Sequence, residues 1–163
     1  MNKKVLTAFN DQFNLEYESS YLYLSMASYC EAEGYNGIAN WMKQQSKEEL
    51  AHAMKFWGFI FESNETVTLG ALNAPKAKWT SIKAVFEASL AHEEKVSKSI
   101  DDLINLSIQN KSHAAHHFLL GFATEQIEEE NTVRDILRKI QIIGNNPMGV
   151  LMLDKELGGR VQH

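Results

Sequence analysis

The sequence predicts an all-α protein: a four-helix bundle with one long crossover connection and a short fifth helix at its carboxyl end. Along four segments, apolar residues recur at alternating steps of four and three, which is the spacing of one helix face. Both prolines, Pro75 and Pro147, lie outside those segments, where they interrupt no helix. Each segment is about 28 to 30 residues long, or roughly 42 to 45 Å of helix, a length typical of bundles.

Turn-forming residues separate the first helices. Gly34, Asn36 and Gly37 end the first helix and start the second. The stretch 63–79 shows no helical stripe and is rich in residues that favour turns. Because it is long enough to run the length of the bundle, it predicts that the second and third helices are parallel.

Capping residues mark the later helices. Thr80 or Ser81 is expected to cap the third helix, and Ser112 the fourth. Asn146 followed by Pro147 is the expected start of a short fifth helix. We expect a single domain over residues 1–163, with helices over about 3–33, 36–62, 80–108, 112–143 and 147–157.

Polar residues interrupt each apolar stripe near its middle. In chain order they are Glu16 in the first stripe, Glu49 with His52 in the second, Glu93 in the third, and Gln126 with Glu129 in the fourth. A carboxylate inside an apolar core is costly unless it is paired or bound to a cation. Since all four helices carry such a group at similar heights, the sequence predicts a metal site shared by the whole bundle.

The spacing of these polar residues repeats between the two halves of the chain. Glu16 and Glu49 are 33 positions apart, and so are Glu93 and Gln126. Glu49 and His52 lie one turn apart on the same helix face, where they can bind one ion. Carboxylates with one imidazole favour iron or manganese over a thiolate-seeking metal, although zinc would also bind.

The ligand set is large enough for two ions. Glu16 and His52 would be terminal ligands of one ion and Glu49 could bridge, so that a second ion could use Glu93 and Glu129. Gln126 is a weaker ligand or a hydrogen-bond donor to one. Tyr23 lies on the same stripe as Glu16, either as a hydrogen-bond or one-electron donor or as packing. Two ions bridged by a carboxylate can deliver two electrons to dioxygen, which one ferrous ion cannot.

Composition argues against several classes of function. The net charge of −5 disfavours nucleic-acid binding through a basic face. No apolar run approaches the roughly 20 residues that a membrane-spanning helix needs, and no apolar signal segment follows the first residues. The single cysteine, Cys30, rules out an intrachain disulfide and fits a reducing compartment. We therefore expect a cytoplasmic protein without nucleic-acid or membrane partners.

With these residues in place, the chain resembles the bacterial non-haem ferritins of the ferritin-like superfamily. The segments that carry the resemblance are Asn14–Ser20, Glu48–His52, His92–Glu94 and Glu125–Glu130. By this resemblance the ferroxidase-centre ligands correspond to Glu16, Glu49, His52, Glu93, Gln126 and Glu129, with Tyr23 as the tyrosine beside them. A third iron site of such ferritins maps to Glu48, Glu125, Glu128 and Glu129.

The resemblance also implies a function. It implies iron storage and detoxification, in which Fe(II) is oxidised by O2 or H2O2 at a di-iron centre within each subunit. The ferric mineral would be stored in a hollow shell of 24 identical subunits. Haem is not expected, because bacterioferritins repeat Glu-x-x-His where this chain has Gln126-x-x-Glu129. Leu50 also stands where their haem-binding methionine would fall.

Other interpretations remain open at this point. One is a di-metal bundle enzyme, an oxygenase or peroxidase, that uses the same carboxylates on another substrate. Another is a helical interaction protein whose buried carboxylates are only hydrogen-bonded. The route by which iron enters is also open: the start of the fourth helix, which lines the threefold channel in many ferritins, carries His113, His116 and His117.

Overall fold

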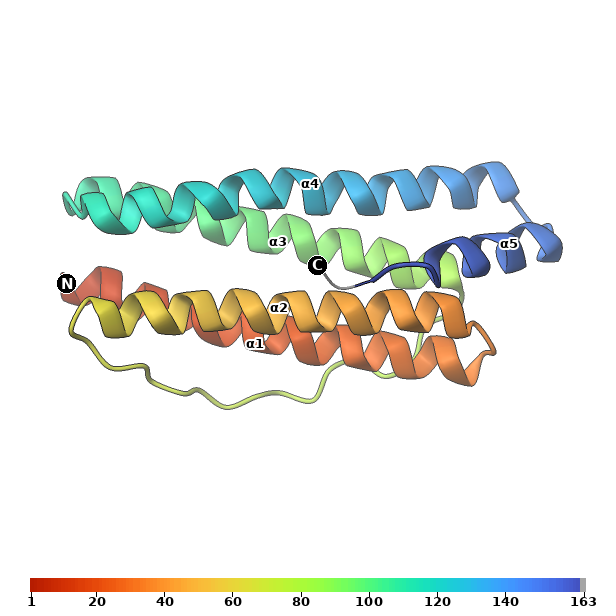
Figure 1. Ribbon diagram of the computed structural model, residues 1–163, viewed down its shortest axis with the longest axis horizontal. Helices are drawn as coiled ribbons and strands as arrows, with labels where there is room; N and C mark the ends of the chain where they lie inside the picture. Colours follow the sequence, from red (N-terminus) through yellow and green to blue (C-terminus); the bar gives the residue numbers. More distant parts are fainter. Residues whose placement is uncertain (162–163) are drawn as a thin grey trace.

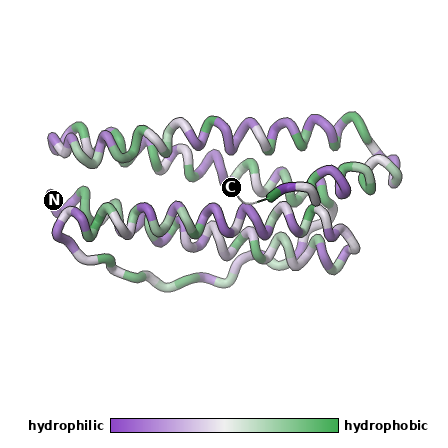
Figure 2. The backbone as a smooth tube through the Cα atoms, viewed as in Figure 1, coloured by the Kyte–Doolittle hydropathy of each residue, from purple (hydrophilic) through white to green (hydrophobic). Residues whose placement is uncertain are grey.

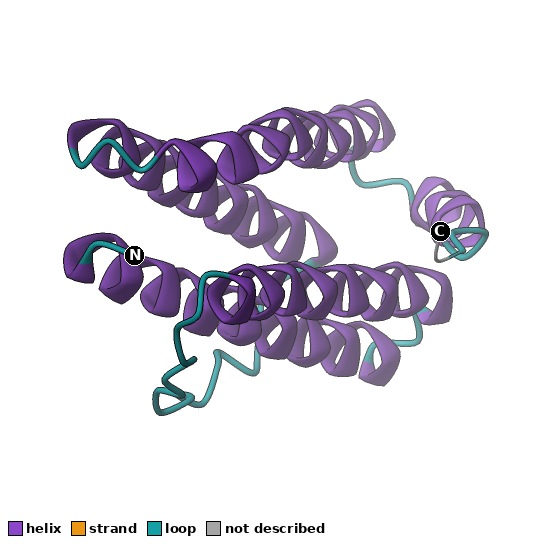
Figure 3. Ribbon diagram, turned by 60° about the vertical axis from the view of Figure 1, so that its left-hand side comes forward, coloured by secondary structure: helices purple, strands orange, loops and turns teal. Residues whose placement is uncertain are grey.

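The computed structural model describes residues 1–161, which form five helices and no strand. They are α1 (Lys3–Ala32), α2 (Asn36–Glu62), α3 (Ile82–Gln109), α4 (His113–Ile143) and α5 (Pro147–Leu157). Their ends lie within two residues of the expected ones. The predicted fold class, an all-α four-helix bundle with a short fifth helix, is confirmed (Figure 3).

Two antiparallel hairpins make up the bundle. α1 pairs with α2 and α3 pairs with α4, while α1 and α3 also contact each other. The connection between the hairpins runs along the outside of the first one, from one end of the bundle to the other (Figure 1). α2 and α3 therefore point in the same direction, as the length of this connection predicts.

Asparagine side chains of α1 hold the crossover connection in place. The backbone N–H of Thr68 donates to Oδ1 of Asn10 at 2.5 Å, and that of Gly70 donates to Oδ1 of Asn14 at 2.7 Å. The Asn14 amide in turn donates to the Thr68 carbonyl at 3.0 Å. These contacts satisfy backbone groups that have no partner in a helix or sheet.

Two of the three helix caps expected from the sequence form a capping hydrogen bond. The Ser81 side chain accepts from the Ala84 N–H at 3.1 Å at the start of α3. Asn146 caps α5 by accepting from the Met148 N–H at 3.0 Å, with a proline in the first turn. Ser112 occupies the N-cap position of α4 but its side chain makes no capping bond, so that part of the expectation is wrong.

The apolar core is divided into two clusters by a polar layer. One cluster surrounds Met26, Met42 and Phe86, and the other surrounds Phe9 and Phe56. The polar residues singled out in the sequence lie between these clusters along every long helix. Figure 2 shows that hydrophilic and hydrophobic residues alternate along each of the long helices. Over residues 1–161, no helix combines the length and apolar character that crossing a bilayer requires.

Candidate metal centre

Three side chains from α1 and α2 meet in the polar layer. Ligand atoms of Glu16, Glu49 and His52 all lie within 4.8 Å of one another, and all three residues are buried. The oxygen Oε2 of Glu16 is buried and has no hydrogen-bond partner among residues 1–161. Because an unpaired carboxylate oxygen inside a protein is destabilising, this atom points to a cation as its missing partner. The donor set, two carboxylates and one imidazole, fits iron.

The ionisation of this cluster reflects its burial. Burial, followed by the negative charge of Glu49, raises the pKa of Glu16 well above its usual value. Burial by itself would also raise the pKa of Glu49, but the hydrogen bond and positive charge of His52 outweigh it, and the net shift is downward. Burial would lower the pKa of His52, yet Glu125 and Glu49 raise it to about 11. A metal ion that binds here therefore displaces protons.

The two ring nitrogens of His52 have different neighbours. Nδ1 lies 3.4 Å from Oε2 of Glu49, inside the cluster, and Nε2 lies 3.1 Å from Oε2 of Glu125 on α4. Lys55 also contacts Glu125, with its Nζ 3.0 Å from Oε1. The hydrogen bond from His52, ahead of the one from Lys55, lowers the pKa of Glu125 to about 2. An Nε2–H bond to Glu125 leaves Nδ1 to face an ion.

Glu93 lies at the centre of a second hydrogen-bonded group, formed by α1, α3 and α4. It accepts from the Tyr23 hydroxyl, and its Oε2 accepts from Nε2 of Gln126 at 3.2 Å. The Tyr23 hydroxyl also lies 2.8 Å from Oγ of Ser89. Burial, then the charge of Glu49, raises the pKa of Glu93 to about 8. Burial and the charge of Glu93 raise the pKa of Tyr23, so this phenol stays protonated and serves as a donor.

A glutamine amide joins the two halves of the site. Nε2 of Gln45 donates to Oε1 of Glu49 at 2.8 Å and to Oε2 of Glu129 at 3.0 Å. Burial, then the charge of Glu49, raises the pKa of Glu129 to about 7. Carboxylates from α2 and α4 are thus held against the same amide. Five of the six residues that the sequence suggested as ligands are buried in this layer together with Tyr23, and the sixth, Glu129, is partly buried and joined to it through Gln45.

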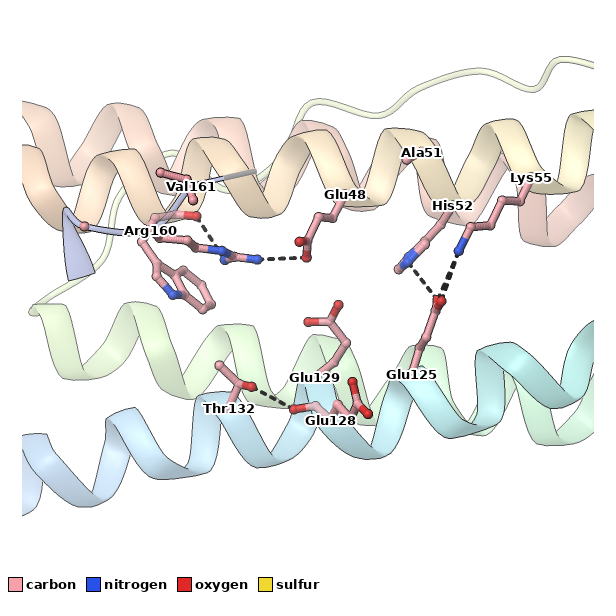
Figure 4. Close-up of a pocket in the computed structure, with 12 residues that line it drawn as sticks. Glu48, Ala51, His52, Lys55, Glu125, Glu128, Glu129, Thr132, Arg160 and Val161 are labelled. Atoms are coloured by element: carbon pink, nitrogen blue, oxygen red, sulfur yellow. Dashed lines mark hydrogen bonds and ion pairs between the residues drawn. The ribbon is translucent and has the colours of Figure 1, made fainter. Parts of the chain in front are cut away.

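A pocket of about 730 Å³ opens between α2 and α4 beside this layer (Figure 4). It is lined by all four residues to which a third iron site was mapped, namely Glu48, Glu125, Glu128 and Glu129. Their carboxylates are engaged separately. Glu48 is bound to Arg160 at 2.8 Å, Glu125 contacts His52 and Lys55, and Glu128 is exposed.

Two glutamines belong to the site although the sequence analysis did not single them out as functional. Nε2 of Gln12 donates to Oε1 of Glu16 at 2.6 Å, and Ser99 fixes the other end of the amide by donating to its Oε1 at 2.5 Å. Gln45 makes the equivalent contact with Glu49. A signal was present, because each glutamine precedes a site glutamate by four residues and the two glutamines are themselves 33 positions apart.

Comparisons with known proteins agree with the fold. The family described as "Ferritin-like domain" matches residues 6–143. A bacterial non-heme ferritin of Bacteroides fragilis is 38% identical over 160 residues, which are 98% of this chain and 99% of that protein. A probable bacterial non-heme ferritin-like protein of Haemophilus influenzae is 32% identical over 97% of this chain and 96% of that protein.

A solved structure is also similar. The open pore ferritin of the hyperthermophilic archaeon Archaeoglobus fulgidus superimposes with a TM-score of 0.98, at 42% identity, over 99% of both chains. Fold and side chains together define a helical bundle with a buried site of carboxylates and one imidazole. The chain belongs to the ferritin family.

Proposed function

We propose that the protein oxidises Fe(II) to Fe(III) at a di-iron centre within the bundle and stores the ferric product. The single observation that carries the proposal is the buried cluster of Glu16, Glu49 and His52, with Oε2 of Glu16 unpaired. Membership of the ferritin family supports iron as the substrate. The depth of the site supports a small ion rather than an organic substrate.

Different side chains would bind each of the two ferrous ions. Glu16 and His52 would hold one ion and Glu93 with Glu129 the other, with Glu49 between them as the bridge. Gln126 and Tyr23 hold Glu93 in place by hydrogen bonds. Each ferrous ion loses one electron, so an adjacent pair supplies the two electrons that, with two protons, reduce O2 to H2O2. Positioning both ions at once is the contribution of the protein.

A third, weaker iron site is proposed in the pocket between α2 and α4. An ion there would compete with Arg160 for Glu48 and with Lys55 for Glu125. Because these cations already neutralise the two carboxylates, we expect the third ion to bind less tightly than the first two. Glu128 is exposed and Glu125 is partly exposed, which supports a site closer to solvent than the buried pair.

We further propose that 24 copies assemble into a hollow shell and that the protein works in the cytoplasm. A single chain leaves large apolar side chains exposed, among them Ile142, Leu151 and Met152 near its carboxyl end. Apolar surface of this kind is typical of contacts between subunits. The family membership supports an oligomeric ferritin assembly, and the single cysteine, Cys30, supports a reducing compartment.

The double substitution Glu49→Ala and His52→Ala tests the ferroxidase directly. We expect it to abolish rapid oxidation of the first two ferrous ions per chain, measured by stopped-flow absorbance under air. Glu87→Ala, which removes an exposed carboxylate of α3, is the control and should oxidise iron like the parent protein. An unchanged rate in the double variant would sink the proposal and favour carboxylates that are merely hydrogen-bonded.

A further inference from the structure

The chain that follows α5 returns to the metal centre and lies across α2. Nδ2 of Asn40 donates to the carbonyls of Gly158 at 3.3 Å and of Arg160 at 3.1 Å, so the backbone of this arm is fixed to the helix. The Arg160 side chain then extends along α2 into the pocket (Figure 4). The chain after α5 therefore brings a cation to a pocket whose lining includes the carboxylates of Glu48, Glu125, Glu128 and Glu129.

The guanidinium of Arg160 is held on several sides. Cζ lies 4.5 Å from the centre of the Trp41 ring, and one terminal nitrogen donates to the Trp41 carbonyl at 3.3 Å. The other terminal nitrogen donates to Oε2 of Glu48 at 2.8 Å and to Oε1 of Gln45 at 2.9 Å. The side chain is only 20% exposed. This geometry uses the planar, donor-only character of arginine, which lysine does not share.

The bond to Gln45 fixes the direction of a buried amide. A guanidinium carries only donors, so the amide oxygen must face Arg160 and the amide nitrogen must face the opposite way. On that side lie the carboxylates of Glu49 and Glu129, which both accept from the amide. If the amide turned over, its oxygen would face two carboxylates and its nitrogen would face a cation. Within residues 1–161, the structure gives Oε1 of Gln45 no other donor.

We propose that Arg160 is a positioning residue for the metal centre: it orients Gln45, which in turn holds Glu49 on α2 and Glu129 on α4 in place to bind ions. The inference rests on the proposed function, in which Glu49 and Glu129 bind iron. It makes the placement of these two ligands depend on a contact of Arg160, in the chain that follows α5. The route is indirect, since Arg160 does not itself touch Glu49 or Glu129. Residue 160 lies more than 30 positions beyond the last predicted ligand.

The test is anaerobic titration of the metal-free, full-length protein with Co(II), followed by the visible ligand-field absorption of the bound ion. We expect Arg160→Gln to weaken Co(II) binding about tenfold, which is the effect of losing a residue that orients a metal ligand. Arg138→Gln is the matched control, because Arg138 is an exposed arginine of α4 paired with Asp135. The control should bind Co(II) like the parent protein.

A double-mutant cycle separates orientation from simple stabilisation. If Arg160 acts through Gln45, Arg160→Gln should have little further effect on Co(II) affinity in a Gln45→Leu background. Arg160→Lys keeps a positive charge near Glu48 but lacks the planar guanidinium with its several donor nitrogens. It should therefore not restore the affinity for Co(II). Additive effects, full rescue by lysine, or a lowered thermal midpoint with unchanged Co(II) binding would each overturn the inference. Failure of the parent protein to bind Co(II) would instead overturn the proposed function, and the inference with it.

Discussion

Glu16 shows most clearly how a single residue links sequence to function. It lies on the apolar stripe of α1, is fully buried, and receives one hydrogen bond, from Gln12. Its other oxygen has no hydrogen-bond partner in the described part of the chain, and burial raises the pKa of Glu16 well above the usual value. Natural proteins retain such a costly group where it has a function. The metal-free site is therefore a locally destabilised state that a cation relieves.

Stability of the metal-free protein should decrease as pH rises. The pKa values of Glu93 and Glu129 are about 8 and about 7 in the folded protein, above the ordinary value of 4.5. Between these values the folded state holds protons that the unfolded state has released, so the free energy of unfolding falls as pH rises through this window. We expect a decrease on the order of 5 kcal/mol between pH 5.5 and pH 8.5 from these two groups together.

Thermal unfolding at both pH values, with and without Co(II), measures this effect. Added Co(II) should restore stability more at pH 8.5 than at pH 5.5, because the carboxylates that bind it are then free of protons. His52 and Glu125 titrate outside this window, at about 11 and about 2. A stability that rises with pH in the metal-free protein would contradict the assignment of buried, proton-holding carboxyls.

Tyr23→Phe isolates one hydrogen bond of the site. The substitution removes the hydroxyl that donates to Glu93 and contacts Ser89. We expect a loss of about 1–3 kcal/mol in the free energy of unfolding, because the buried carboxyl group of Glu93 loses a hydrogen-bond donor. Tyr21→Phe is the control, since that side chain is 47% exposed, and should change stability by less than about 0.5 kcal/mol. Equal effects in urea titrations of the two variants would refute this role of Tyr23.

At the scale of helices, α5 supplies the capping side chain for the first turn of α2. The N-cap position of α2 is Tyr35, whose side chain makes no capping bond, and Oδ1 of Asp154 on α5 instead accepts from the Ile38 N–H at 2.8 Å. The approach is so close that a Cβ on Gly37 would lie 1.9 Å from the Asp154 carbonyl oxygen. The short helix is therefore part of the bundle, and it carries the arm that ends at Arg160.

Gly37→Ala should consequently destabilise the protein, whereas Gly58→Ala should not. Both glycines lie in α2, but a Cβ at Gly58 meets nothing within 4 Å. We expect Gly37→Ala to cost about 1–3 kcal/mol through the forced displacement of α5. Gly58→Ala should stabilise the helix by up to about 1 kcal/mol. Chemical denaturation measures the free energy of unfolding of both variants. A change of the same sign in both would contradict the close packing of α5 against Gly37.

The sequence predicted the helices well because their stripes are long and their breaks are marked by glycine and asparagine. The direction of α3 followed from the length of the crossover alone. The capping of α2 by Asp154 was not predictable, since the two partners are 116 residues apart and only the folded chain brings them together. The contact of Arg160 with Gln45 was hidden for the same reason. Gln12 and Gln45, in contrast, share the 33-residue repeat and were accessible from spacing.

On the scale of the whole molecule, the chain buries its candidate metal site but leaves apolar side chains exposed. Met148 and Met152 lie one turn apart on α5, with exposed fractions of 64% and 72%. Met148→Glu with Met152→Glu should lower the mass of the assembled particle, because charges would have to be buried in a subunit contact. Helix content and the binding of two Co(II) ions per chain should remain. Light scattering gives the mass, and an unchanged particle would place this surface outside the assembly.

The most direct test of the central claim is aerobic addition of many ferrous ions per chain to the metal-free protein, followed by size-exclusion chromatography with iron detection. If the protein is a ferroxidase that stores iron in a shell, oxidation will outpace the protein-free control and iron will co-elute with a very large particle. Binding of only about two ions per chain, in a small particle, would contradict storage and leave a di-metal bundle enzyme as the better interpretation.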